Sequence, residues 1–203
     1  PGWKTYWRTP GDAGYPLMID VTGSTNVAEA KVAWPVPHRF QLFGLQTFGY
    51  GEEVAFPLMV TPVTPGAPVA LKASIRYLVC ETVCIPQDGA LALDLPRGAA
   101  TPTGHAPLVN RFASLVPRSG ERLGWSVERV AVDQQDQLVV DARSTGELFD
   151  APDVIVEGAP HFYFGPPRVE LSVDRQSARL YVPVERLGKG AELGASDLML
   201  TLF

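Results

Sequence analysis

Proline and glycine divide this chain into short segments, and that division limits the folds open to it. The 203 residues contain 19 prolines and 19 glycines, placed in small groups along the whole sequence. Proline has no backbone N–H for the interior of a helix or a central strand, and glycine favours turns. Long stretches of helical periodicity are almost absent. The pattern therefore predicts many short strands joined by turns.

Alternating apolar residues place four strands in the first half of the chain. The clearest is Val69 to Val79, where the odd-numbered residues form the apolar side. Asn26 to Trp34, Glu52 to Val60 and Ala90 to Leu95 are predicted as the other three. Pro57 inside the second of these marks an edge or a bulge, because a central strand needs its N–H donors.

A linker and one short helix follow these strands. Pro96 to Pro107 has few large apolar residues, so it adds little to a core and is predicted to be a linker. Behind it, apolar residues recur at the spacing of one helical face, with Pro107 in a position suited to a first helical turn. These apolar residues are Leu108, Val109, Phe112, Leu115 and Val116.

The second half of the chain returns to a strand pattern with turn signals between the strands. This spacing is typical of an antiparallel sandwich. We therefore expect an all-β protein with two β-sandwich domains, at residues 1–96 and 121–203, and a linker with a short helix at 97–120. The predicted strands of the second domain are Gly124 to Val132, Gln137 to Ala142, Asp153 to Glu157, Arg168 to Val173, Ala178 to Pro183 and Leu198 to Phe203.

Charge and hydropathy exclude two classes of function. The formal net charge is -5 and lysine and arginine form no block, which argues against nucleic acid as a partner. No run of about 18 apolar residues is present, so no segment is expected to span a membrane. The chain begins with Pro1 rather than methionine, and we expect it to be a processed or excised piece of a longer polypeptide.

The chemistry of this chain is concentrated in its two cysteines, Cys80 and Cys84. Val79 is predicted to end one strand and Ile85 to begin the next, so the cysteines face each other across the mouth of a hairpin. Cβ atoms in such a position are about 4.5–5.5 Å apart, close to the range of a disulfide. A disulfide that closes a loop this short adds little stability to a fold, since the stabilisation grows with the length of the closed loop. The spacing therefore favours thiol–disulfide exchange over a structural staple.

Two alternatives to an exchange role remain open for the cysteine pair. Two thiolates alone suffice for Cu(I), which prefers soft ligands, so a copper-binding module is one alternative. Zinc needs two further ligands, and the histidines at 38, 105 and 161 show no ligand spacing. A closed structural disulfide in an adaptor protein is the other alternative. No helix follows the pair and Glu81 opposes thiolate formation, so the cysteines are expected to relay electrons rather than to act as a strongly acidic thiol.

Several blocks of the first half resemble a known family. They are PGWKTYWRTPGDAGYP (Pro1 to Pro16), WPVPHRF (Trp34 to Phe40), FGLQTFGYGEEVAFPL (Phe43 to Leu58) and YLVCETVCIPQDGALALDLP (Tyr77 to Pro96). Together they are similar to the N-terminal periplasmic segment of the ScsB branch of the DsbD superfamily of membrane thiol–disulfide reductases. The second half has no equally specific motif.

The resemblance implies a fold, a reaction and a set of partners. Immunoglobulin-like folding is expected, with a redox-active Cys80–Cys84 disulfide and no other cofactor or metal. Cys84 is expected to be the nucleophile and Cys80 the resolving thiol. Electrons would come from the thioredoxin-like C-terminal domain and the membrane domain of the same polypeptide and pass to periplasmic thioredoxin-fold proteins of the ScsC type. The branch is associated with copper tolerance. The three-residue spacing is shorter than in DsbD, and family members normally have a further strand before the region that corresponds to Pro1.

The resemblance also implies a cap over the cysteines. In the family, an aromatic loop shields the pair until a partner arrives. Pro37 to Gly51 has the position and composition of such a loop, with three glycines that favour movement. Phe43 is the first cap candidate because it aligns roughly with the family's cap phenylalanine; Phe48 and Tyr50 follow. The alternative that these rings are ordinary core residues remains open.

Overall fold

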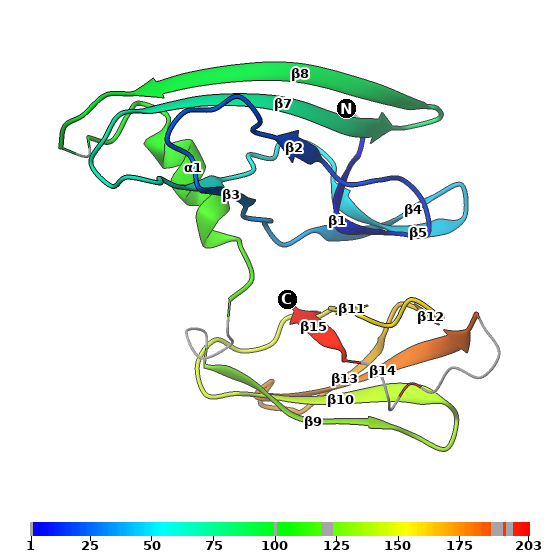
Figure 1. The fold of residues 1–203 in the computed structure, drawn as a ribbon. Helices are drawn as coiled ribbons and strands as arrows, with labels where there is room; N and C mark the ends of the chain where they lie inside the picture. Colours follow the sequence, from blue (N-terminus) through cyan, green and yellow to red (C-terminus); the bar gives the residue numbers. More distant parts are fainter. Residues whose placement is uncertain (1, 100, 119–123, 188–192, 194–196) are drawn as a thin grey trace. The chain divides into compact units, whose positions relative to one another are not determined.

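The structure is a computed structural model that describes residues 2–99, 101–118, 124–187, 193 and 197–203. It divides into two compact units, Pro1–Pro117 and Arg118–Phe203. Each unit consists of strands, and α1 (Ala106–Ser114) is the helix of the first unit (Figure 1). The predicted all-β fold class is confirmed. No helix in the described part of the chain is both long and apolar enough to cross a membrane.

The first unit is built from three small antiparallel sheets. One has the strand order β1-β5-β4, one has the order β2-β7-β8, and the third pairs β3 with β6. The strands are β1 (Thr5–Gly11), β2 (Met18–Asp20), β3 (Glu29–Val32), β4 (His38–Leu42), β5 (Leu45–Tyr50), β6 (Leu58–Thr61), β7 (Val69–Cys80) and β8 (Cys84–Leu95).

The long hairpin of β7 and β8 dominates the first unit (Figure 1). Its register runs without a break from Val69 opposite Leu95 to Cys80 opposite Cys84. The predicted strand at 69–79 is confirmed, and the predicted strand at 90–95 extends back to Cys84. Tight antiparallel pairing of this length fixes the position of the turn, because a slip of one residue would move every side chain to the other face.

The segment predicted as a cap loop forms a second hairpin, from β4 and β5. Its two-residue turn consists of Phe43 (φ 53°) and Gly44 (φ 80°), the positive-φ pair that matches the twist of the flanking strands. Gly49 is buried in β5, where a Cβ atom would clash with the backbone of Thr5 in β1. The glycines of this segment therefore permit close strand pairing, and the expectation of a loop was wrong.

A small apolar cluster joins the β1-β5-β4 sheet to β7. Tyr6, Leu42, Leu78 and Cys80 are its buried members. The predicted apolar face of β7 has odd numbers, yet Leu78 and Cys80 have even numbers. The last residues of β7 are thus covered on the face where Lys72 and Arg76, earlier in the strand, are exposed. Leu78 and Cys80 are buried on this face because they pack against Tyr6 of β1 and Leu42 of β4.

The helix packs within the first unit. Pro107 lies in its first turn, as predicted, and Phe112 is its buried residue. The N–H of Val36 donates to the carbonyl oxygen of Leu115 at 2.7 Å, and Arg111 pairs with Glu53 at 3.1 Å. The division of the chain at Pro117 accordingly assigns the helix to the first unit.

The second unit is a sandwich with its own core. A sheet of order β12-β14-β10-β9, with β13 also paired to β14, lies against a two-stranded sheet of β11 and β15. Residues of β10, β11 and β14 form the buried cluster, including Val140, Val154 and Leu180. The strands are β9 (Trp125–Val132), β10 (Gln137–Ser144), β11 (Val154–Glu157), β12 (Phe162–Phe164), β13 (Arg168–Leu171), β14 (Ser177–Arg186) and β15 (Met199–Leu202).

Candidate redox site

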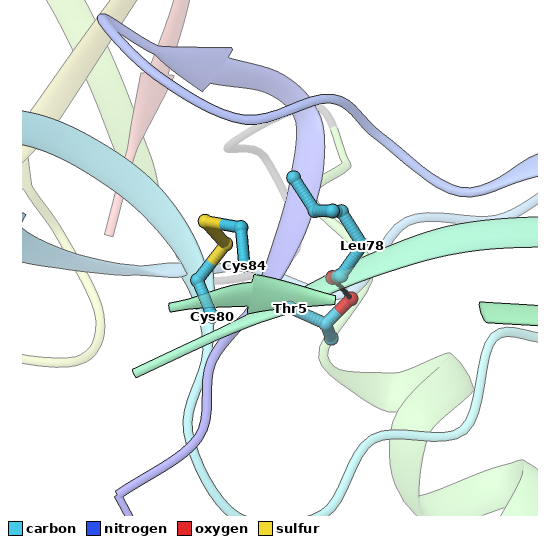
Figure 2. The surroundings of a disulfide bond; sticks show 4 residues. All are labelled: Thr5, Leu78, Cys80 and Cys84. Carbon is cyan, nitrogen blue, oxygen red and sulfur yellow. Dashed lines mark hydrogen bonds between the residues drawn. A yellow bond between two sulfur atoms is a disulfide. The ribbon is translucent and has the colours of Figure 1, made fainter. Parts of the chain in front are cut away.

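The two cysteines form a disulfide at the turn of the long hairpin. Cys80 is the last residue of β7 and Cys84 the first of β8, and the register places them directly opposite each other. Their Cα atoms are 4.1 Å apart and their sulfur atoms are bonded (Figure 2). The predicted position of the pair across the hairpin mouth is confirmed.

The two sulfur-bearing residues differ in exposure. Cys80 is fully buried, with 0% of its surface exposed, whereas Cys84 is exposed. The turn between them is exposed, and Val83 and Ile85 beside Cys84 present apolar side chains to solvent. Exchange requires an incoming thiolate to reach one sulfur atom, and access controls its rate. Of the two residues, Cys84 is the one that an incoming thiol can approach.

Backbone hydrogen bonds from the N-terminal segment hold Cys80 in place. The N–H of Lys4 donates to the carbonyl oxygen of Cys80 at 2.8 Å. In return, the N–H of Cys80 donates to the carbonyl oxygen of Lys4 at 2.9 Å. One step along, the Thr5 hydroxyl donates to the carbonyl oxygen of Leu78 at 3.1 Å (Figure 2). The end of β7 thus has a backbone partner on each side, β8 and the Lys4 bridge just before β1, which fixes the buried cysteine more firmly than a free hairpin tip.

Three aromatic side chains, Tyr6, Tyr15 and Phe40, belong to or pack against the cluster that contains Cys80. Tyr6 lies in the same buried cluster, and Phe40 packs against that cluster with its ring centroid 6.4 Å from that of Tyr6. Burial raises the pKa of the Tyr6 hydroxyl, so this residue stays uncharged. Neither Tyr6 nor Phe40 is among the site residues predicted from the sequence, although Phe40 lies in the segment predicted as the cap. Alternation in the blocks that contain them was the available signal, but it does not show which strand lies beside the cysteines.

The three predicted cap residues occupy different environments. Phe43 is 67% exposed at the tip of the β4–β5 hairpin. Phe48 is buried beneath Arg39, whose guanidinium carbon lies 4.9 Å from the ring centroid. Tyr50 is buried, and burial raises the pKa of its hydroxyl strongly. Cys80 shares its buried cluster with none of these three residues. Their role as a cap stays a prediction.

The described residues include no group of three or more histidine, cysteine, aspartate or glutamate side chains that would suit a metal ion. His38 lies in β4, His105 precedes α1 and His161 precedes β12. The copper alternative would therefore depend on the two cysteine sulfurs, which are bonded to each other in this structure. Cu(I) would need the reduced pair.

Comparisons with known proteins support the geometric findings. Residues 1–96 match the family described as "Thiol:disulfide interchange protein DsbD, N-terminal". Residues 115–203 match a "Domain of unknown function (DUF8393)". The crystal structure of the N-terminal periplasmic domain of ScsB from Proteus mirabilis is similar, with a TM-score of 0.72 and 28% identity over 99% of this chain and 78% of that chain. Among curated proteins, no sequence matches the chain.

Proposed function

Residues 1–96 of this chain match the DsbD N-terminal domain family, and from this premise we propose that the chain is the periplasmic module of a membrane thiol–disulfide reductase. The Cys80–Cys84 disulfide is its thiol–disulfide exchange centre. The observation that carries the proposal is the asymmetric pair itself, directly opposed in the hairpin, with one cysteine buried and one exposed. A short loop between the thiols allows repeated opening and closing without unfolding the sheet.

The asymmetry supports a division of roles between the thiols. An incoming thiolate attacks the exposed Cys84 sulfur, and Cys80 leaves as the thiolate. In the opposite direction, the Cys84 thiolate attacks a partner's disulfide and forms a mixed disulfide. Cys80 then attacks the Cys84 sulfur, restores the internal disulfide and releases the reduced partner. This order follows from access, because a buried sulfur cannot be the first to meet a folded partner.

The proposed partners come from the resemblance to the ScsB branch. Electrons reach the pair from a thioredoxin-like domain and a membrane domain of the same polypeptide, and pass to periplasmic thioredoxin-fold proteins of the ScsC type. The structure supports a protein partner, because Val83 and Ile85 next to Cys84 expose apolar side chains on which such a partner can pack. An association with copper tolerance belongs to the same proposal and rests on the resemblance alone.

The structure suggests one further residue that shields the cysteine pair. The family resemblance assigns the cap to Phe43, Phe48 or Tyr50. Phe40 lies on the same hairpin and packs against the cluster that contains Cys80. We include Phe40 as a shield of the buried sulfur and keep Phe43, at the exposed turn, as the candidate for a movable cap.

Titration of the pair in glutathione buffers tests the proposed function. After equilibration, thiols are alkylated and the reduced and oxidised fractions are measured by intact mass. Exchange proteins have reduction potentials between about −120 and −270 mV, whereas structural disulfides lie below about −300 mV. We expect a value within the first range. A pair that stays oxidised in buffers that reduce DsbD-type proteins would contradict the proposal and favour the closed structural disulfide.

A further inference from the structure

Lys4 lies directly beside the buried Cys80, to which it is joined by an antiparallel backbone bridge. The two residues exchange both backbone hydrogen bonds, so they form a directly opposed antiparallel pair. In such a pair the Cα atoms are about 5.5 Å apart and both side chains leave the sheet on the same face. The Lys4 side chain and the Cys80 sulfur therefore share one face, together with Tyr6, the next residue of that face along β1.

The Lys4 ammonium is held near this face, and no carboxylate of the described residues forms an ion pair with it. Lys4 is half-buried, and its Nζ lies 5.9 Å from the centroid of the Phe40 ring. It also lies over the backbone of Gly51, where a Cβ atom would be only 2.8 Å from Nζ. Within the part of the chain that the structure describes, no carboxylate lies within ion-pair distance of Lys4. Glu81, although adjacent to Cys80 in sequence, has its carboxylate against Gly2.

We propose that Lys4 is a positioning residue of the exchange reaction that stabilises the thiolate of Cys80. This inference rests on the proposed function and adds the cationic neighbour that the sequence alone does not reveal. An adjacent lysine favours the thiolate form of a cysteine, and a more stable thiolate is a better leaving group. Lys4 thereby acts on the buried cysteine that leaves, while Cys84 remains the sulfur that partners attack.

The reaction balances as two exchanges. A partner thiolate attacks the Cys84 sulfur, the Cys80–Cys84 bond breaks, and its electron pair stays on Cys80 as the thiolate opposite Lys4. The partner's second thiol loses its proton to solvent and attacks the partner sulfur of the mixed disulfide. Cys84 leaves as a thiolate and the partner is oxidised. Solvent protons then convert the cysteine thiolates to thiols to the extent that the pH dictates.

Other charges near Cys80 do not replace Lys4. Besides Lys4, the strands around Cys80 carry ionisable side chains at Tyr6 and Arg8 (β1), His38 and Arg39 (β4), Tyr50 (β5), Lys72, Arg76 and Tyr77 (β7), and Asp88 and Asp94 (β8). Tyr15 packs against the Cys80 cluster, Glu81 follows Cys80, and Glu52 and Glu53 line the same cavity as Lys4. Arg76 pairs with Asp88 at 3.0 Å, and Arg8 lies over the Trp7 ring at 4.2 Å. Burial raises the pKa of the Tyr6 hydroxyl further above its ordinary value, so this group adds no charge near Cys80 at neutral pH. Direct backbone pairing to Cys80 distinguishes Lys4 from these groups.

The test compares Lys4→Met, which removes the charge at similar length, with Lys4→Arg, which keeps it. Two quantities are measured on the 203-residue chain. One is the equilibrium constant for reduction of the Cys80–Cys84 pair by glutathione. The other is the pKa of the Cys80 thiol, from thiolate absorbance in a Cys84→Ala background. We expect Lys4→Met to raise this pKa and to lower the equilibrium constant about tenfold, which is about 30 mV. Lys4→Arg should remain near wild type.

Lys72→Met is the matched control, because Lys72 is an exposed lysine on the same strand as Cys80 and away from the pair. It should change neither quantity. Equal values for Lys4→Met and wild type, or equal losses for Lys4→Met and Lys4→Arg, would overturn the inference. If Lys4→Met does not fold, the pKa of Cys80 in Cys84→Ala with Lys4 intact is measured at several salt concentrations. This pKa should rise with ionic strength, and a salt-independent pKa overturns the inference. A wild-type pair that cannot be reduced contradicts the proposed function instead.

Discussion

The hydroxyl of Tyr50 donates a hydrogen bond to the carbonyl oxygen of Pro35 at 2.6 Å, in a fully buried contact. This bond joins the last residue of β5 to the segment that leads into β4. The Tyr50 ring also meets Phe56 edge to face, with centroids 5.3 Å apart. One side chain thus closes the base of the β4–β5 hairpin, whose strands form the sheet with β1 beside the cysteines.

Removing this hydroxyl should destabilise the first unit. In Tyr50→Phe the carbonyl of Pro35 loses its buried donor, and we expect the free energy of unfolding to fall by about 1–3 kcal/mol. Urea unfolding measures the change. Tyr181→Phe is a suitable control, because that hydroxyl donates to Glu170 at an exposed position of the second unit. A loss as large in the control as in Tyr50→Phe would show that burial of the bond is unimportant.

Alkaline pH should weaken the fold through Tyr50. Burial raises the pKa of its hydroxyl above the ordinary value of 10.0, so the unfolded chain loses this proton first. The stabilisation is then complete below about pH 10 and is lost as the pH rises toward the folded-state pKa. Urea unfolding between pH 8 and 11, with the disulfide intact, should show a steeper decline for wild type than for Tyr50→Phe. Burial raises the pKa of Tyr6 as well, so part of the decline should remain in the variant. Parallel curves for the two proteins would contradict this account.

Trapping experiments should distinguish the two cysteines. Cys80→Ala retains the exposed Cys84, and after reduction it should form a mixed disulfide with an oxidised thioredoxin-like protein that accumulates because no resolving thiol remains. Cys84→Ala retains only the buried Cys80 and should give at least about tenfold less adduct, since access limits the exchange. Intact mass measurement quantifies the adducts, and dithiothreitol should remove them. Equal trapping by the two variants would mean that burial does not set the roles.

Removal of a shielding ring should expose the reduced pair to small oxidants. We expect Phe40→Ala to speed the reaction with glutathione disulfide several-fold, because it opens the cluster that buries Cys80 and lets small disulfides reach that thiol as well as the exposed Cys84. Phe43→Ala should give a smaller increase, which would identify a movable cap at the hairpin turn. Reaction with a thioredoxin-like partner should change less in both variants, since docking displaces the shield. Stopped-flow rate constants measure these effects. Unchanged rates in both variants would show that the hairpin does not shield the pair.

Damage to the second core should leave the redox centre unaffected. Leu180 is fully buried in β14, and Leu180→Ala should lower the stability of the second unit by about 2–5 kcal/mol. Leu148→Ala, at a 48% exposed position, provides a control that should cost much less. The reduction potential of Cys80–Cys84 should be the same in both variants, because the cysteines belong to the first unit. A shifted potential in Leu180→Ala would mean that the second unit tunes the pair.

Local pattern predicted some strands well and others not at all. Val69 to Val79 alternates over eleven residues, and the structure forms β7 there. By contrast, β1 and β4 are strands because they pair with β5, a choice that their proline, glycine and aromatic content does not reveal. The glycines of the β4–β5 hairpin suggested mobility, yet Gly49 is required where β1 and β5 approach each other. Propensity describes one segment, whereas pairing depends on a partner far away in the sequence.

The sequence by itself determined that the two cysteines meet. Three residues between two strands form a turn, and antiparallel pairing then places Cys80 opposite Cys84. Only the tertiary structure decided how the two differ. The N-terminal segment, 76 residues before Cys80, forms an isolated antiparallel bridge to the end of β7, packs Tyr6 in the cluster that buries Cys80, and places Lys4 opposite it. Spacing fixes contacts between neighbours in sequence, but burial and charge at a sulfur atom depend on packing between segments that no local pattern relates.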